Sequence, residues 1–332
     1  MGIKEYIEQN EKLFTIGKMP IKYIFCDGNN SDKLIVTFPG FSSPKNPPKY
    51  NYIRTLSDCN CHRLYILDDY GPRGSYLIGK NRNQSIEESV MALILTICAK
   101  YNINSKNVIL QGSSKGGYIA LYYGIKYEFG NVITGAPQIN LGNYLLYVAP
   151  EVAKYITGGT EKEDIMYLNS FLYDYLNDES IEFPKIFIHV GKGDHHYKGH
   201  IIPFLSRLKD KGINYEINVK EYFSHNSIGY YYPEYLLKTL HNIDNKIISC
   251  SSSIKSEINY ENGLFRINCY PNDDNLKYAC HLYKENEIIA KVNYQKQSTF
   301  EFINKLKGIF RAKLYVKDKF HVNSTFTDEI KI

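Results

Sequence analysis

Residues 107–123 read NVILQGSSKGGYIALYY. An apolar run typical of a buried strand comes first, and an apolar run typical of a helix comes last. Between them lies a Gly-x-Ser-x-Gly motif, with Ser114 at its centre and Gly112 and Gly116 two residues to either side. A serine in such a strand-to-helix turn projects its hydroxyl at the end of a sheet, and its neighbours must be small. The stretch predicts a nucleophile elbow, although a glycine-rich turn without chemistry would read the same.

Ser114 needs two partners to act as a nucleophile. A hydroxyl becomes reactive at neutral pH when a base takes its proton, and a carboxylate orients that base. In sheets of this type the acid and then the histidine follow the serine, each in a loop after a later strand. Asp194 ends a glycine-rich turn after the expected strand at 185–190, and His225 follows the expected strand at 214–219. We predict Ser114 as nucleophile, His225 as base and Asp194 as orienting acid.

The partners of Ser114 also have simpler interpretations. An aspartate in a glycine turn commonly only stabilises the turn, and a histidine after a strand is commonly incidental. Their order and placement relative to the serine favour the catalytic interpretation. His195 and His196 are rival bases, but they share the loop of the acid, so we expect them to bind substrate or to be structural. The backbone N–H groups of Phe41 and Lys115 are predicted to form the oxyanion hole.

Strands and helices alternate up to about residue 245. The expected strands cover 23–26, 34–38, 63–67, 107–110, 132–135, 185–190 and 214–219, and the expected helices cover 5–14, 86–101, 200–208 and 233–241. Capping-box patterns at Ser85 and Thr160 place a helix N-terminus at each. The alternation predicts a mostly parallel sheet with helices on both faces. Residues 138–180 interrupt it, and their pattern predicts a helical, lid-like insertion.

The pattern changes after residue 247. Residues 247–253 have the composition of a linker, and five short alternating runs follow at 264–269, 278–283, 288–294, 299–303 and 310–316. Short strands separated by turn residues predict a small antiparallel β-sandwich. The expected domains are therefore a catalytic domain over 1–247 and an accessory domain over 253–332.

Composition excludes several classes of protein. The chain has 332 residues, 43% hydrophobic and 23% charged, which is typical of a soluble protein of two domains. Its net charge of +5 is dispersed, which fits an anionic substrate, and no basic run indicates nucleic acid. No apolar run approaches the roughly 20 residues of a membrane span, and the N-terminus lacks the apolar segment of a secretion signal. Seven irregularly spaced cysteines predict reduced thiols in a cytoplasm.

Two other clusters are weaker candidates for chemistry. Cys59, Cys61 and His62 could be part of a metal site, but no second ligand pair stands at a suitable spacing, so no metal is expected. Asp68 and Asp69 could be paired carboxylates of glycoside or metal chemistry. Adjacent residues at a strand end point apart, which argues against a joint role.

Four segments together resemble the α/β-hydrolase-type capsular polysaccharide O-acetyltransferases, the family of the meningococcal serogroup A capsule acetyltransferase. The segments are Phe38-Pro39-Gly40-Phe41, Gly112-Ser113-Ser114-Lys115-Gly116-Gly117, Gly193-Asp194-His195-His196 and Ser224-His225-Asn226. The resemblance covers about residues 20–245 and does not include the C-terminal β-domain.

The resemblance implies an O-acetyltransferase. Acetyl would pass from acetyl-coenzyme A, through an acetyl-serine, to a hydroxyl of a capsular or other surface polysaccharide. Acetyl-coenzyme A would be a co-substrate, and no cofactor would be bound permanently. A cytoplasmic location is implied. Two points are left open: peripheral association with a capsule synthesis or export complex at the inner membrane, and homo-oligomerisation.

The residues by themselves leave the second reaction step open. A serine esterase, such as a carbohydrate deacetylase, would use the same triad with water as acceptor, and exclusion of water by residues 138–180 would decide between the two. A scaffold that kept only the fold is a third class, which the intact triad argues against. Lys115, Arg73, Lys80 and Arg82 could bind phosphates of coenzyme A or of a phosphosugar polymer, although such side chains are commonly solvated.

Overall fold

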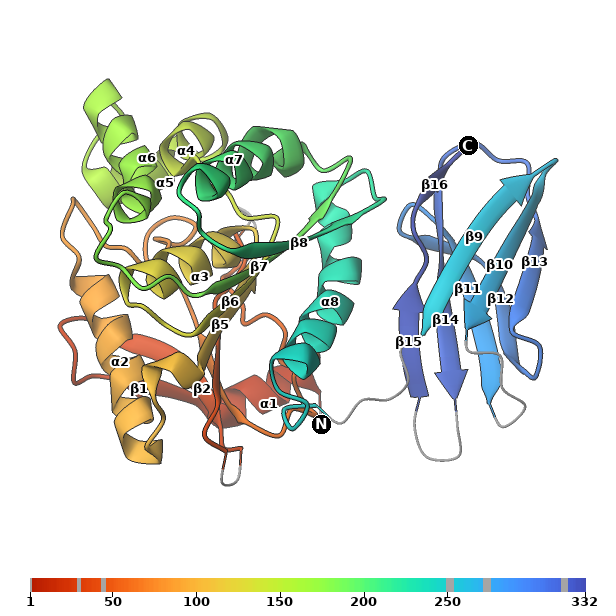
Figure 1. Ribbon diagram of the computed structural model, residues 1–332, viewed down its shortest axis with the longest axis horizontal. Helices are drawn as coiled ribbons and strands as arrows, with labels where there is room; N and C mark the ends of the chain where they lie inside the picture. Colours follow the sequence, from red (N-terminus) through yellow and green to blue (C-terminus); the bar gives the residue numbers. More distant parts are fainter. Residues whose placement is uncertain (1, 29–30, 43–45, 249–253, 271–275, 318–321) are drawn as a thin grey trace. The chain divides into compact units, whose positions relative to one another are not determined.

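The computed structural model describes residues 2–28, 31–42, 46–248, 254–270, 276–317 and 322–332. They form two compact units, drawn in Figure 1. The first comprises Met1–Val190, His195–Asn218 and Leu236–Ile248, and the second comprises Gly191–Asp194, Val219–Tyr235 and Ser249–Ile332. Most of the expected linker at 247–253 lies outside the described residues.

The second unit is more than a C-terminal segment. It joins the C-terminal strands to Gly191–Asp194 and Val219–Tyr235 from the middle of the chain. Sequence patterns alone predicted a division between residues 247 and 253. Packing groups the residues differently, because Tyr222 and Tyr231 form a hydrophobic cluster with Phe326 from the C-terminal strands.

An eight-stranded sheet runs through the first unit, in the order β1-β2-β4-β3-β5-β6-β7-β8. Its strands are β1 (Glu11–Phe14), β2 (Ile21–Cys26), β3 (Leu34–Thr37), β4 (His62–Ile66), β5 (Val108–Ser113), β6 (Asn131–Gly135), β7 (Lys185–Gly191) and β8 (Tyr215–Lys220). Strands β4, β3, β5, β6 and β7 pair in parallel, and β1 and β2 pair antiparallel at one edge. Every residue of β3 and β5 is buried. The mostly parallel sheet predicted from these apolar runs is confirmed.

Helices flank the sheet. They are α1 (Ile3–Asn10), α2 (Ser85–Tyr101), α3 (Lys115–Lys126), α4 (Leu141–Val148), α5 (Pro150–Thr157), α6 (Lys162–Leu176), α7 (Ile202–Asp210) and α8 (Ile228–Ile243). Figure 1 shows α2 and α3 on one side of the sheet, and α1 with the C-terminal half of α8 on the other. Residues 138–180 contain α4, α5 and α6, so this stretch is helical as expected. None of the described helices is both long and apolar enough to cross a bilayer.

Four local predictions were wrong at element ends. Residues 11–14 form β1 rather than the end of a helix, because they pair with β2 and bury Phe14. Helix α8 begins at Ile228, so Pro233 lies inside it. Ser85 lies within α2, after the N-cap Gln84, so the capping box predicted there does not form. At α6 the cap is one residue later than predicted, with Glu161 N–H donating to Asp164 Oδ2.

The C-terminal strands form two antiparallel sheets. They are β9 (Lys255–Glu261), β10 (Leu264–Tyr270), β11 (Lys277–Lys284), β12 (Glu287–Gln295), β13 (Thr299–Ile303), β14 (Ile309–Lys317), β15 (Val322–Phe326) and β16 (Ile330–Lys331). One sheet has the order β13-β10-β9, and the other has the order β12-β11-β14-β15 with β16 on β14. Alternate residues of β10, β11, β13 and β14 share one core. Each of the five expected strands is present, and β9, β15 and β16 were not predicted.

Candidate active site

Ser114 lies in the turn between β5 and α3, with φ 55° and ψ −118°. Such a conformation costs a residue with a side chain about 1–3 kcal/mol. The Ser114 N–H donates to the Gly135 carbonyl at 2.7 Å. A Cβ built on Gly112 would lie 2.5 Å from the carbonyl carbon of Gly116, so glycine is required there. A strained backbone with small neighbours is the geometry that the sequence motif predicted for this turn.

The loop after β3 lies beside the N-terminus of α3. A Cβ on Gly116 would lie 2.4 Å from the Phe38 carbonyl oxygen, so the two backbones are in contact. Gly40 N–H donates to Asn51 Oδ1 at 2.9 Å, which fixes the loop that carries Phe41. Both segments predicted to supply oxyanion donors therefore lie at the same end of the sheet.

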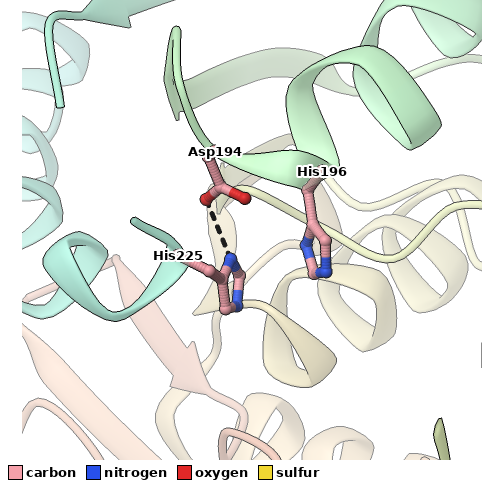
Figure 2. A group of neighbouring side chains, drawn as sticks. All are labelled: Asp194, His196 and His225. Atoms are coloured by element: carbon pink, nitrogen blue, oxygen red, sulfur yellow. Dashed lines mark hydrogen bonds and ion pairs between the residues drawn. The ribbon is translucent and has the colours of Figure 1, made fainter. Parts of the chain in front are cut away.

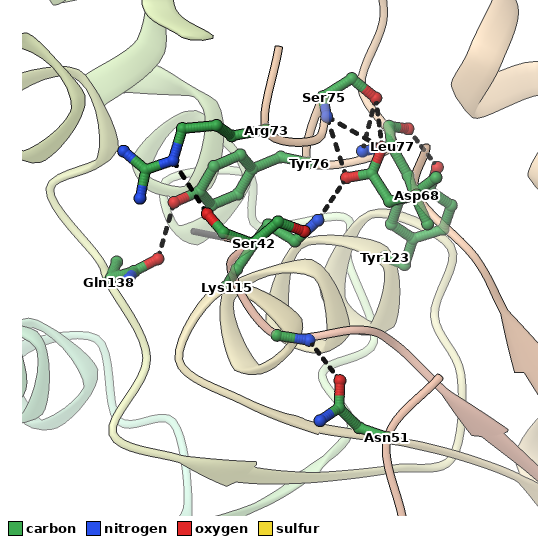
Figure 3. Close-up of polar contacts among 11 residues, drawn as sticks. Ser42, Asn51, Asp68, Arg73, Ser75, Tyr76, Leu77, Lys115, Tyr123 and Gln138 are labelled. Carbon is green, nitrogen blue, oxygen red and sulfur yellow. Dashed lines mark hydrogen bonds and ion pairs between the residues drawn. The ribbon is translucent and has the colours of Figure 1, made fainter. Parts of the chain in front are cut away.

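Gln138 reaches the hydroxyl of Ser114. Its Nε2 donates to Ser114 Oγ at 2.9 Å, and Tyr76 OH donates to Gln138 Oε1 at 2.7 Å, a contact drawn in Figure 3. Gln138 and Tyr76 are fully buried, and burial raises the pKa of the Tyr76 phenol well above its ordinary value. A protonated phenol fixes the amide with its NH₂ group toward the serine. Sequence reasoning missed Gln138, whose only signal is a polar residue just after a buried strand.

Lys115 forms a buried ion pair beside Ser114. Its Nζ lies 2.6 Å from Asp68 Oδ2, and both side chains are 0% exposed. Ser75 N–H and Oγ also donate to Asp68, at 2.8 and 2.9 Å (Figure 3). The Lys115 side chain is thus directed into the protein rather than toward a phosphate in solution. Asp69 pairs instead with a different lysine, so the two neighbouring carboxylates do not act together.

Replacing Lys115 by methionine is expected to lower the free energy of unfolding by about 3–5 kcal/mol, because Asp68 would keep an uncompensated buried charge. Urea unfolding followed by circular dichroism measures this. Lys22→Met is the matched control: Lys22 pairs with Asp69 at 2.8 Å but is 46% exposed, so its loss should cost about 1 kcal/mol or less. Equal losses in the two variants would contradict a structural role for the buried pair.

Asp194 and His225 are in contact in the second unit. His225 Nδ1 lies 2.8 Å from Asp194 Oδ2, as Figure 2 shows. Gly193 N–H donates to the Tyr222 carbonyl at 3.0 Å, which ties the turn of the acid to the segment that leads to the histidine. Asp194 is 2% exposed. With Nδ1–H given to the carboxylate, Nε2 is the nitrogen that can accept a proton from a hydroxyl.

The two histidines that follow Asp194 in its loop differ in exposure. His196 is fully buried, and its Nδ1 lies 2.8 Å from the Ala136 carbonyl oxygen. His195 is exposed and packs edge-on against the His196 ring, with the two ring centroids 4.3 Å apart.

The two predicted arginines are both engaged within the first unit. Arg73 Nε donates to the Ser42 carbonyl at 2.8 Å (Figure 3). Its guanidinium lies 4.2 Å from the centroid of the Phe41 ring. Arg82 donates to Asp164 Oδ1 at 2.8 Å. Arg73 therefore lies against the loop of a predicted oxyanion donor, whereas Arg82 ties its own loop to α6.

The cysteine–histidine cluster lies in the first unit, with both thiols buried. Burial raises the pKa of both Cys59 and Cys61 to about 12. His62 Nδ1 accepts a hydrogen bond from the Gly28 N–H at 3.1 Å.

Comparison with known sequences relates the chain to proteins of a secretion system. The family model described as the accessory Sec system GspB-transporter matches residues 18–214. An accessory Sec system protein of Streptococcus gordonii is 25% identical over 163 residues, 46% of this chain and 31% of that protein. An accessory Sec system protein of Staphylococcus aureus (strain NCTC 8325 / PS 47) is 30% identical over 120 residues, 36% of this chain and 22% of that protein. The match thus spans less than a third of the length of either relative.

Comparison with solved structures relates the chain to a capsule O-acetyltransferase and, in fold alone, to a serine hydrolase. A mutant of the capsule O-acetyltransferase of Neisseria meningitidis serogroup A, solved in complex with CoA, is 26% identical, with a TM-score of 0.59 over 69% of this chain and 94% of that chain. A fluorophosphonate-binding serine hydrolase of Staphylococcus aureus shares the fold at 14% identity and a TM-score of 0.51, over 70% of this chain and 94% of that chain. The resemblance to a capsule acetyltransferase predicted from the motifs is present in the structure.

The family match includes Ser114 and Asp194 and ends before His225. Residues 18–214 are more than half of the chain, and they contain strands β2 to β7 with the turn of Ser114. The motifs did not predict this family. The chain belongs to the accessory Sec system GspB-transporter family.

Proposed function

We propose that this chain is an O-acetyltransferase, which moves acetyl from acetyl-coenzyme A to a hydroxyl of a capsular or other surface polysaccharide. The observation that carries the proposal is Ser114, strained at the N-terminus of α3 with the Gln138 amide at its oxygen. The similar meningococcal enzyme was solved with CoA, which supports the same co-substrate here.

In the first step of the proposed reaction, Ser114 Oγ attacks the thioester carbonyl of acetyl-coenzyme A. His225 takes the serine proton, and Asp194, 2.8 Å from its Nδ1, stabilises the imidazolium. The backbone N–H groups of Phe41 and Lys115 stabilise the oxyanion. The carbon–sulfur bond then breaks, the thiolate leaves with the proton from His225, and the acetyl remains on Ser114.

In the second step a glycan hydroxyl attacks the acetyl-serine. His225 accepts the hydroxyl proton and returns it to Ser114 Oγ as the ester bond to the enzyme breaks. Helices α4, α5 and α6, which the sequence pattern placed in a lid-like insertion, are proposed to limit access of water to this intermediate.

The descriptions of the relatives suggest a second class of acceptor for the proposed reaction. The two sequence relatives belong to an accessory Sec system, and a Glycosylation Associate Protein complex of Streptococcus agalactiae shares the fold at 20% identity. A glycan attached to an exported protein is therefore a second acceptor to test beside a capsular polysaccharide. We place the reaction in the cytoplasm, with the enzyme peripheral to a membrane export complex.

A serine esterase is the alternative function. The fold is shared with serine hydrolases, and an esterase would use the same serine, histidine and aspartate with water as acceptor. The two functions differ only in which hydroxyl attacks the acetyl-serine.

Release of free thiol from acetyl-coenzyme A separates the two functions. We expect the wild-type protein to release thiol when a suitable polysaccharide or glycoprotein glycan is present, with acetyl appearing on that glycan. The control reaction contains acetyl-coenzyme A without glycan and should release little thiol. Cleavage of a simple acetyl ester without thiol release under any condition would support the esterase instead.

A further inference from the structure

The segment that carries His225 packs against the C-terminal β-domain within the second unit. Tyr222 and Tyr231 stack with ring centroids 4.9 Å apart and an interplanar angle of 4°. Phe326 of β15 packs against Tyr231, and Tyr231 OH donates to the Thr327 carbonyl at 2.8 Å. The C-terminal strands therefore contact Tyr231, which follows the histidine, and Tyr231 stacks on Tyr222, which precedes it.

Glu329 contacts the segment on both sides of His225. This residue, just before β16, is buried. One carboxylate oxygen accepts from Phe223 N–H at 2.9 Å, and the other accepts from Ser227 Oγ at 2.7 Å. These two donors lie two residues before and two residues after His225. The Glu329 N–H also donates to the Glu221 carbonyl, at 2.8 Å.

Arg311 of β14 compensates the charge of Glu329. Its Nη1 lies 2.8 Å from Glu329 Oε1, and the two side chains are 2% and 1% exposed. The guanidinium also lies 3.8 Å over the ring of Tyr230, a residue of α8. A buried carboxylate is stable only when paired and hydrogen-bonded in this way, so the position of Glu329 is fixed by the β-domain.

We propose that Glu329 is a positioning residue, which holds the His225 turn so that the imidazole meets the reacting hydroxyl. The proposal rests on the proposed function, in which His225 is the base. Asp194 holds one ring nitrogen, but a ring also needs a fixed backbone. Within the described part of the chain, the Glu329 carboxylate contacts donors on both of its oxygens, so the turn requires an acceptor at both positions. The β-domain is thereby part of the catalytic apparatus.

Glu329→Gln in the full chain tests this proposal. The glutamine side chain places its NH₂ group against one of the donors that Glu329 accepts from. It also removes the negative charge that pairs with Arg311. We expect kcat for Ser114-dependent turnover of acetyl-coenzyme A or of an acetyl ester to fall about 100-fold, since small displacements of a reacting group cost this much. KM should stay unchanged. Glu301→Gln is the matched control, because Glu301 forms an exposed pair with Arg266 on the same domain, and it should keep the wild-type kcat.

The same substitution made in a His225→Ala protein separates a positioning role from general destabilisation. In His225→Ala, Glu329→Gln should lower the residual rate no further, because Glu329 acts through the missing ring. An equal loss in both backgrounds would overturn the proposal. If Glu329→Gln does not fold, Ser227→Ala removes one donor and no charge, and it should lower kcat in the same direction by less. A wild-type kcat in folded Ser227→Ala would then count against the proposal.

Hydrogen exchange provides a readout that needs no turnover. The Phe223 amide should exchange about ten- to a hundredfold faster in Glu329→Gln, because it loses a hydrogen bond to a charged group, while Glu301→Gln should leave it unchanged. Unchanged exchange in Glu329→Gln would overturn the proposal. If the wild type has no Ser114-dependent activity, the proposed function fails, and the exchange result still decides whether Glu329 holds the segment of His225.

Discussion

Ser114→Ala is expected to lower the rate of thiol release from acetyl-coenzyme A by about 10⁴- to 10⁶-fold, the loss found when a serine nucleophile is removed from a triad. The hydroxyl is the only atom of the residue that alanine lacks, and it is the atom that would carry the acetyl. The acetyl adduct on the peptide that contains residue 114, detected by mass spectrometry before acceptor is added, should also disappear.

The neighbouring serine provides the control for this substitution. Ser113 Oγ lies 2.5 Å from Tyr52 OH, so this hydroxyl is bound to a phenol. Ser113→Ala should therefore keep its turnover and its acetyl adduct. Thiol release that survives in Ser114→Ala, or that is lost only in Ser113→Ala, would show that Ser114 is not the nucleophile.

Asp194→Asn is expected to lower kcat by about 10⁴-fold with little change in protein stability. Asparagine has the same shape, but its NH₂ group can hold the ring of His225 in the tautomer that has its proton on the wrong nitrogen. The 2.8 Å contact between Asp194 Oδ2 and His225 Nδ1 is the one affected. Steady-state kinetics and thermal unfolding of the same preparation measure both effects.

Asp69→Asn is a matched control for this second substitution. Asp69 forms a partly exposed pair with Lys22, so its loss should leave kcat unchanged. A wild-type kcat in Asp194→Asn would contradict the assignment of Asp194 as the orienting acid. A loss confined to KM would place it in substrate binding instead.

The parts of this structure that were predictable from the sequence are those with a local signal. The buried strand β5 and the glycines around Ser114 predicted the elbow backbone, and regular alternation predicted the parallel sheet. Element ends were less predictable. Strand β1 forms because β2 offers an edge to pair with, and no pattern within residues 11–14 contains that information.

Asp194 and His225 were predicted from their loops after late strands, whereas the other polar partners near the site were not predictable, because each comes from far along the chain without such a pattern. Gln138 lies 24 residues from Ser114, and Asp68 lies 47 residues from Lys115. Glu329 lies 102 residues from Ser227. Each partner is a single polar residue whose neighbours in the sequence show no motif. Only the packing of the chain brings it to the site.

The grouping of Val219–Tyr235 with the C-terminal strands bears on how such a chain is inherited. A recombination event that joined residues 1–248 to a different C-terminal sequence would keep the sheet and the elbow intact. It would also leave Phe223 and Ser227 without the carboxylate that accepts their hydrogen bonds. Descendants of this protein can therefore exchange the C-terminal strands only for strands that supply an equivalent acceptor, and the two halves of the gene are expected to evolve together.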